Sequence, residues 1–134
     1  MPQHFPDRQT SLEQAIDRHS LVVPPDTPVL DAIASMSNAR VSCVLVAQQQ
    51  TLLGILTERD VVRLAAIQMP LVGVAISQVM TQNLVTLSLA EADTIFDVLA
   101  LLHSSGIRHL PILDEQGNLL GVITSDRLAE KTQG

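Results

Sequence analysis

The segment GILTERD, residues 54–60, carries the side chains of this chain that are best suited to binding a small molecule. Its apolar residues predict the end of a strand, and Thr57 is expected to begin a helix. A helix N-terminus presents backbone N–H groups and a partial positive charge to an anion or a ligand oxygen. Thr57 can donate or accept a hydrogen bond there, and the carboxylate of Asp60 can accept the paired hydroxyl groups of a ribose. The segment therefore predicts a site for a ligand with a sugar diol.

The same two residues also have a purely structural interpretation. Thr-x-x-Asp resembles the spacing of a capping box, in which the Thr57 side chain bonds the Asp60 N–H and the Asp60 side chain reaches back to the Thr57 N–H. The two interpretations differ in one respect. A ligand site needs the carboxylate free at the opening of a groove, whereas a cap folds it onto its own backbone.

A second polar cluster lies in GIRHLP, residues 106–111, where Arg108 and His109 begin an otherwise apolar predicted strand. A guanidinium can bind a phosphate in a forked geometry, and an imidazole adds a donor near neutral pH. Alternatively, Arg108 forms a surface ion pair with a carboxylate. We expect this cluster to lie on the phosphate side of a ligand.

The segment 43–60 (CVLVAQQQTLLGILTERD) returns as residues 110–127 (LPILDEQGNLLGVITSDR). An internal repeat of this kind predicts two similar units, related by a pseudo-two-fold axis, with two related clefts. In the second copy Arg127 takes the position of Asp60, and Asp126 precedes it by one residue, or about 100° around a helix. We therefore expect the Thr57/Asp60 cleft to be the better site. The cleft at Thr124 would be empty or would favour a ligand without a free diol.

The first copy lacks the Arg-His pair of the second. We expect Arg40-Val41-Ser42 to stand at the positions of Ile107-Arg108-His109.

Each copy is expected to contain a strand, a helix, a hairpin and a final helix, which predicts an α/β (α+β) fold with sheets buried on one side by helices. The predicted strands are residues 21–23, 41–46, 52–56, 84–87, 110–113 and 119–123. The predicted helices are residues 10–18, one from about residue 28, and residues 57–67, 93–103 and 127–131.

Composition limits the partners. The 134 residues include two Phe, no Tyr and no Trp, so the chain lacks aromatic rings on which successive bases could stack. A net charge of −6 disfavours a nucleic-acid backbone or an anionic membrane. The single Cys43 fits a reducing compartment. No apolar run reaches the length of a membrane span and no signal peptide is evident, so a cytoplasmic location is expected.

Catalysis and metal binding have little support in the sequence. Cys43, His109 and Asp126 are the only candidate nucleophile, base and acid, and an apolar strand should raise the pKa of the Cys43 thiol rather than lower it. The four histidines show no metal-ligand spacing. We expect neither an enzyme nor a metal site.

From about residue 12 to residue 128 the chain resembles a tandem pair of CBS (cystathionine β-synthase-type) domains, a Bateman module. The resemblance rests on GILTERD, on GIRHLPILDEQGNLLGVIT, and on VMTQNLVT at residues 79–86. It implies two β-α-β-β-α units packed through their sheets, a flat homodimer, and a regulatory ligand that contains adenosine: AMP, ADP, ATP or S-adenosylmethionine. It also implies an attached output domain, such as a sensor kinase or cyclic-dinucleotide enzyme of bacteria.

The resemblance also assigns site residues. Thr57 and Asp60 resemble the residues that grip ribose and phosphate, and Arg108 and His109 those that line the phosphate side. Thr124 and Asp126 belong to the second cleft. The strand positions whose backbone meets the adenine are Val22, Val23, Val85 and Thr86.

The repeat predicts an N-terminal arm (residues 1–10), a first CBS unit (11–68), a linker (69–76) and a second unit (77–131). Two functions follow as hypotheses. The first is a sensor of an adenosyl nucleotide, and the alternative is a dimerisation scaffold that has the fold but no ligand.

Overall fold

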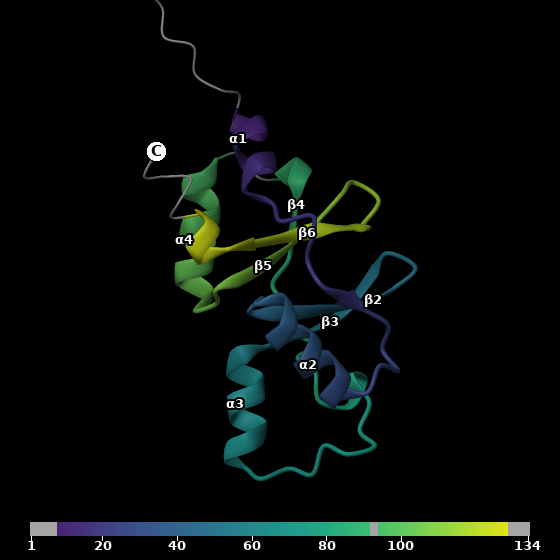
Figure 1. Cartoon of the computed structure of the whole chain (residues 1–134). Coiled ribbons are helices and arrows are strands. Elements are labelled where there is room, and N and C mark those ends of the chain that lie inside the picture. The colour runs from purple at the N-terminus through teal and green to yellow at the C-terminus, as the bar shows by residue number, and fades with distance from the viewer. Residues whose placement is uncertain (1–7, 92–93, 129–134) are drawn as a thin grey trace, which may run out of the picture. The chain divides into compact units, whose positions relative to one another are not determined.

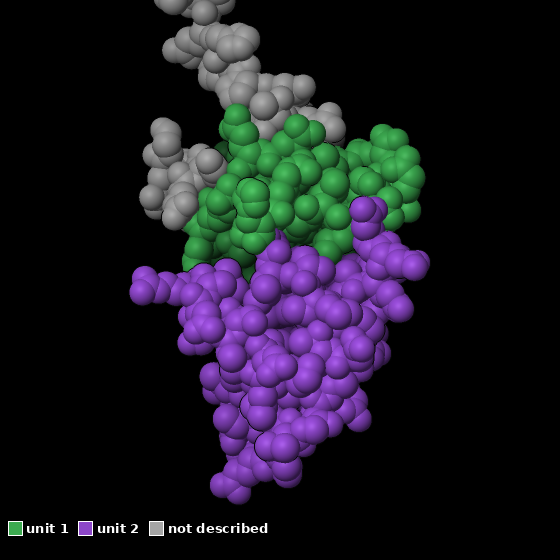
Figure 2. All heavy atoms as spheres, turned by 45° about the vertical axis from the view of Figure 1, so that its right-hand side comes forward, with its two compact units in different colours: residues 1–19, 85–134 green, residues 20–84 purple. Residues whose placement is uncertain are grey.

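The computed structural model describes residues 8–91 and 94–128. They divide into two compact units, shown in different colours in Figure 2. Unit 2 is residues 20–84, and unit 1 combines the described residues before residue 20 with those from residue 85 on. Unit 1 is therefore discontinuous in the sequence, because the N-terminal segment packs with the second copy of the repeat. The domain boundaries predicted from the repeat describe the two sequence copies and not these compact units, and they remain a prediction.

Unit 2 contains the first copy in the predicted element order (Figure 1). Its elements are β1 (Val22–Val23), α2 (Val29–Ala39), β2 (Cys43–Gln48), β3 (Thr51–Thr57), α3 (Glu58–Ala66) and the 3-10 turn η1 (Ile76–Gln78). The sheet has the order β1-β2-β3, with β1 parallel and β3 antiparallel to β2. The central strand β2 is buried from Cys43 to Val46, which explains its continuous apolar run.

From residue 85 on, unit 1 repeats the order of strand, helix and hairpin seen in unit 2. Its elements are α1 (Arg8–Ala15), β4 (Leu87–Ser88), the 3-10 turn η2 (Leu89–Glu91), α4 (Ile95–Ser105), β5 (His109–Leu113) and β6 (Leu119–Thr124). A helical turn follows at residues 125–128, and the rest of the predicted 127–131 helix lies outside the described residues. The sheet order β4-β5-β6 has the same parallel and antiparallel pairings as unit 2. The predicted mixed α/β fold of two similar units is confirmed.

The hairpin registers show which residues correspond between the copies. Cys43 pairs with Thr57, and His109 pairs with Thr124. Both hairpins then have an irregularity at the same place, after Val46 and after Ile112. Cys43 therefore corresponds to His109.

This register corrects the expected match of Arg40-Val41-Ser42 with Ile107-Arg108-His109 by one residue, since Ser42 corresponds to Arg108. Arg40 corresponds instead to Gly106. Both residues end a helix in the left-handed conformation, with φ of 56° and 65°. Left-handed residues at this position are the usual way to end a helix.

The strand predicted at residues 84–87 is shifted in the structure to β4, and Pro111 gives the reason. In unit 2 the Leu45 N–H donates to the Leu21 carbonyl at 2.9 Å, which begins the parallel pairing one residue before β1. The register places Pro111 at the position of Leu45 and Val85 at that of Leu21. Proline has no N–H, so the corresponding bond cannot form and β4 begins only at Leu87.

The outer strand of each sheet is covered by a short segment of the same unit. Thr81 forms an antiparallel bridge with Ile55 on β3, and Asp17 forms the equivalent bridge with Val122 on β6. A glycine beside each bridge makes room. A Cβ on Gly54 would lie 2.5 Å from the Met80 sulfur, and one on Gly121 would collide with the Asp17 carbonyl oxygen. The repeated glycines are thus required by close packing.

The bridge at Asp17 also explains why α1 ends at Ala15 and not at residue 18 as expected. Both backbone polar groups of Asp17 bond to Val122, at 2.8 and 3.2 Å, and this extended pairing is incompatible with a continuing helix. The predicted arm of residues 1–10 falls partly within α1, which begins at Arg8, and residues 1–7 lie outside the described residues.

Each unit has its own apolar core. The core of unit 2 is formed by α2, β2, β3, α3 and the turn near Ile76, around Val44, Leu56 and Leu64. The core of unit 1 includes Leu12 and Ile16, from α1 and the residue after it, packed with α4 and its hairpin. The N-terminal segment is therefore a component of the second core.

Candidate functional site

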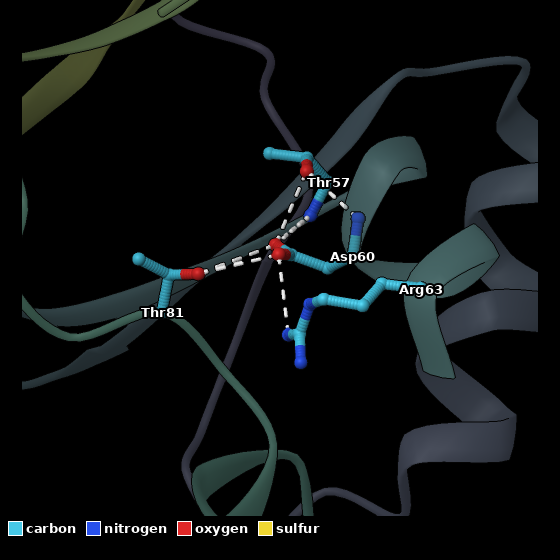
Figure 3. A network of polar contacts seen from close by, with 4 residues as sticks. All are labelled: Thr57, Asp60, Arg63 and Thr81. Atoms are coloured by element: carbon cyan, nitrogen blue, oxygen red, sulfur yellow. Dashed lines mark hydrogen bonds and ion pairs between the residues drawn. The ribbon is translucent and has the colours of Figure 1, made fainter. Parts of the chain in front are cut away.

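The carboxylate of Asp60 lies at the centre of a polar network in unit 2 (Figure 3). Asp60 is the only buried charged residue among those whose burial the structure describes, with 9% of its surface exposed. Thr57, Arg63 and Thr81 approach the carboxylate from three directions. Thr57 ends β3 and caps α3, Arg63 lies one turn after Asp60 on α3, and Thr81 is the residue that bridges to Ile55.

The network contains the capping box that the sequence allowed. The Asp60 N–H donates to Thr57 Oγ1 at 3.3 Å, and the Thr57 N–H donates to Asp60 Oδ2 at 2.9 Å. The Thr57 hydroxyl also donates to Oδ2 at 3.1 Å. The expectation of a carboxylate that is wholly free for a ligand is therefore wrong, because one oxygen of Asp60 is held by its own helix end.

The other carboxylate oxygen is held more loosely. Asp60 Oδ1 accepts from Thr81 Oγ1 at 3.3 Å and faces an Arg63 guanidinium nitrogen at 3.5 Å. Both distances exceed the usual range for hydroxyl and charge-assisted bonds. The Arg63 side chain is 54% exposed, so solvent screens this ion pair. Of the two carboxylate oxygens, Oδ1 is therefore the more weakly held within the protein.

The start of α3 has further N–H groups to satisfy. The Glu58 N–H donates to the Ser42 carbonyl at 3.0 Å, and the capping box uses those of Thr57 and Asp60. Within the described part of the chain, no residue accepts from the Arg59 N–H. The helix end therefore offers one backbone donor, fewer than a bare N-terminus would, together with the partial positive charge of the helix.

The second copy has a different network at the corresponding place. Thr124 again caps a helical start, where its Oγ1 accepts from the Arg127 N–H at 3.1 Å. The Arg127 side chain turns to α1, and its Nε and one terminal nitrogen donate to the carbonyls of Ala15 at 3.0 Å and Gln14 at 3.3 Å. Asp126 is exposed. In unit 1 the position of Asp60 is thus occupied by a cation, Arg127, which donates hydrogen bonds to the last carbonyls of α1.

The other predicted site residues lie in both units. Arg108 is exposed, and its carbonyl accepts from the Ser125 N–H at 3.0 Å, as Ser42 does for Glu58 in unit 2. His109 is half-buried at the first residue of β5. Both belong to unit 1, whereas Thr57 and Asp60 belong to unit 2. Their assignment to one ligand's phosphate remains a prediction.

The residues expected beside an adenine are on or next to the short parallel strands. Val22 is 47% exposed and Val23 is half-buried, and both lie on β1. Val85 and Thr86 precede β4. The register makes Val22 equivalent to Thr86 and Val23 equivalent to Leu87. The assignment of Val22, Val23, Val85 and Thr86 to an adenine remains a prediction.

Sequence reasoning missed Thr81 and the role of Arg63. Arg63 has a recognisable signal, because a residue three positions after Asp60 lies on the same helix face. Thr81 has none in its spacing, since only the pairing of its segment with β3 brings it to the carboxylate. Its segment, VMT, contributes to the resemblance to CBS domains but carries no signal of a contact with Asp60.

Comparison with a family model finds the same domain twice along the chain. The CBS domain family model matches residues 9–67 and again residues 76–134. The chain belongs to the CBS domain family and contains two copies of the domain, which is the arrangement of a Bateman module. The resemblance drawn from the motifs is confirmed.

Two curated relatives are much longer. An uncharacterized protein of Methanocaldococcus jannaschii, MJ1404, is 29% identical over 79% of this chain and 25% of its own length. The inosine-5'-monophosphate dehydrogenase of Thermoplasma acidophilum is 29% identical over 84% of this chain and 22% of its own length. The chain therefore spans about a quarter of each of these relatives.

Solved structures share the fold over nearly the whole chain. The CBS domain protein NE2398 is 27% identical, with a TM-score of 0.82, over 94% of this chain and 97% of that one. CBSX2, solved in complex with AMP, is 23% identical with a TM-score of 0.76, over 90% and 93%. The CBS pair of MJ0100, solved with 5'-methylthioadenosine and S-adenosyl-L-methionine, is 17% identical with a TM-score of 0.78, over 91% and 98%.

The described residues contain neither a candidate membrane span nor a candidate metal site. No helix among them has the length and apolar character needed to cross a membrane. Nor do they bring three potential metal ligands of the His, Cys, Asp or Glu type together.

Proposed function

We propose that this CBS pair is a regulatory module that binds a ligand containing adenosine, either AMP, ADP, ATP or S-adenosylmethionine. Support comes from the family and from two structures of the same fold, one holding AMP and the other 5'-methylthioadenosine with S-adenosyl-L-methionine. The observation that carries the proposal for this chain is the loosely held Oδ1 of Asp60 at the start of α3, where no acceptor among the described residues binds the Arg59 N–H. One accepts a sugar hydroxyl, and the other donates to a ligand oxygen.

The chemistry of this site favours a ligand with both a diol and an anionic group. A ribose hydroxyl can replace the 3.3 Å contact of Thr81 with a shorter charge-assisted bond. Arg63, more than half exposed and on the same helix, can follow an anionic group without losing a buried ion pair. In unit 1, Arg127 offers no acceptor for a hydroxyl. We therefore propose that the Thr57/Asp60 site binds the ligand more tightly than the Thr124/Asp126 site.

The wider context is part of the same proposal. The module has no catalysis of its own, forms a homodimer in the cytoplasm, and passes ligand binding to an attached output domain of a bacterial signalling protein. A ligand can do this only if it binds two states of the module with different affinity. The matches to proteins about four times longer support the idea that such modules work beside other domains.

Isothermal titration with AMP, ATP and S-adenosylmethionine tests the proposal. We expect one of them to bind wild type, and Asp60→Asn, which replaces a charged acceptor by a neutral amide, to weaken binding at least tenfold. Asp97→Ala, which removes the corresponding carboxylate of the capping box at α4, is the matched control and should bind like wild type. Equal binding by wild type and Asp60→Asn would remove Asp60 from the site.

A scaffold without a ligand is the second candidate, and the capping box at Asp60 is the observation that favours it. If both copies use this helix position only for hydrogen bonds to backbone groups of their own unit, Asp60 and Arg127 have the same structural role. No heat with any of the three ligands, together with a stable homodimer in sedimentation, would favour this candidate over the sensor.

A further inference from the structure

Asp60 in unit 2 and Arg127, the equivalent residue in unit 1, each bind the segment that leads to or forms the bridge with the outer strand of their sheet. In unit 2, Asp60 accepts from the hydroxyl of Thr81, the residue that covers the outer edge of β3. In unit 1, Arg127 donates to the carbonyls of Gln14 and Ala15, just before Asp17 covers the outer edge of β6. The charge is opposite, but each side chain reaches from the helix start to the segment beside the outer strand.

Both segments are close in sequence to a point where the chain passes from one unit to the other. Unit 2 ends at Leu84, three residues after Thr81, and unit 1 gives way to unit 2 two residues after Asp17. The bridges at Thr81 and Asp17 are therefore the last backbone pairings before each crossing. What holds these bridges also fixes where each crossing begins.

Three kinds of contact hold Thr81. Its backbone exchanges two hydrogen bonds with Ile55, at 2.9 and 3.0 Å, and its segment fits into the space beside Gly54. The third contact is the hydroxyl bond to Asp60. Only this third contact uses a group that a ligand hydroxyl would also use.

We propose that the Thr81 hydroxyl occupies the place of a ligand hydroxyl on Asp60, and that a ligand diol displaces it and loosens the start of the crossing at residues 81–85. The competition rests on the proposed function, whereas the anchoring of the segment does not. The network of unit 1 cannot be displaced in this way, because Arg127 binds backbone carbonyls and presents no acceptor. The module would then have one contact that responds to ligand and one that does not.

Thr81→Val separates the two parts of this proposal, because valine keeps the shape of threonine and removes only the hydroxyl. Thr51→Val is the matched control, because Thr51 is an exposed threonine at the opposite end of β3 from Thr57. Without ligand, we expect amide hydrogen exchange at Ile55 and Thr81 to be about fivefold faster in Thr81→Val than in wild type, as the loss of one ordinary hydrogen bond implies. Thr51→Val should leave both amides unchanged. Wild-type exchange rates in Thr81→Val would overturn the anchoring.

The competition is measured by titration with AMP and with 2',3'-dideoxy-AMP. We expect Thr81→Val to bind AMP about fivefold more tightly than wild type, since no internal hydroxyl has to be displaced. The dideoxy analogue, which has no diol, should show no such gain. Weaker or unchanged AMP binding by Thr81→Val would overturn the competition. If AMP binds neither protein, the same pair of titrations is made with ATP and 2',3'-dideoxy-ATP. If AMP, ATP and S-adenosylmethionine all fail to bind wild type, the proposed function and the competition both fail, while the exchange data still decide the anchoring.

Discussion

At the scale of single residues, the chain contains its own control for the chemistry of Asp60. Thr57/Asp60 and Thr94/Asp97 are both complete capping boxes, with backbone-to-carboxylate distances of 2.9 and 3.1 Å. Asp97 is exposed, whereas Asp60 is buried and also contacts Thr81 and Arg63. The two sites share the local helix cap and differ in the contacts beyond it.

We expect Asp60→Ala to destabilise the protein by about 2 kcal/mol and Asp97→Ala by about 1 kcal/mol. Both variants lose a cap, but only Asp60→Ala leaves the Thr81 hydroxyl without its charged acceptor. Urea unfolding of the two variants and wild type gives the difference. Equal losses would mean that the contact between Asp60 and Thr81 contributes nothing measurable to stability.

Residue types alone pointed to Thr57 and Asp60 but could not decide whether the carboxylate of Asp60 is free or used in a helix cap. The spacing of Thr57 and Asp60 fits both a ligand grip and a cap, and the structure shows the cap on one oxygen only. What was missing is long-range: Thr81 reaches Asp60 through a bridge between residues far apart in the sequence. Likewise, no local pattern indicates that Arg127 bonds to carbonyls 112 and 113 residues away.

At the scale of elements, the repeat predicted the order of strands and helices because each copy shows the hydrophobic periods of its elements. Its errors lie where one element depends on another. β4 starts later than predicted because Pro111 of β5 has no N–H to donate. α1 ends earlier than predicted because Asp17 pairs with β6. Both errors concern backbone hydrogen bonds between segments, which a periodicity in the sequence does not contain.

The attachment of α1 can be tested through Arg127. The guanidinium bonds to the last carbonyls of α1, where a cation also interacts favourably with the helix dipole. We expect Arg127→Met, which keeps an apolar stem, to speed amide exchange at residues 12–17 about tenfold and to lower stability by about 1 kcal/mol. Arg18→Met, at an exposed position of the same unit, is the control and should change neither.

The exchange pattern also separates a local from a global effect. A local attachment predicts faster exchange in residues 12–17 with β2 and β3 unaffected, since unit 2 has a separate core. Exchange that accelerates equally in both units would mean that Arg127 supports the stability of the whole chain rather than the attachment of α1.

At the scale of the whole molecule, the sequence repeat and the compact units do not coincide. The repeat assigns residues 11–68 to the first copy, but residues before 20 pack with the second. Leu12, Ala15 and Ile16 are almost completely buried in the core of unit 1. Burial of the two larger side chains, those of Leu12 and Ile16, contributes about 2 kcal/mol each, which is a large part of the stability of a domain this small.

Fragments of the chain test which division governs folding. Residues 20–84 contain every residue of the unit 2 core, so we expect this fragment to unfold cooperatively in urea. Residues 77–131, the second unit as the repeat defines it, lack Leu12, Ala15 and Ile16 and should show no cooperative transition. Joining residues 8–19 to residues 85–131 through a flexible Gly/Ser linker of about 10 residues should restore one. If residues 77–131 fold alone as stably as the joined chain, the N-terminal segment is dispensable and the division given by the repeat is also the unit of folding.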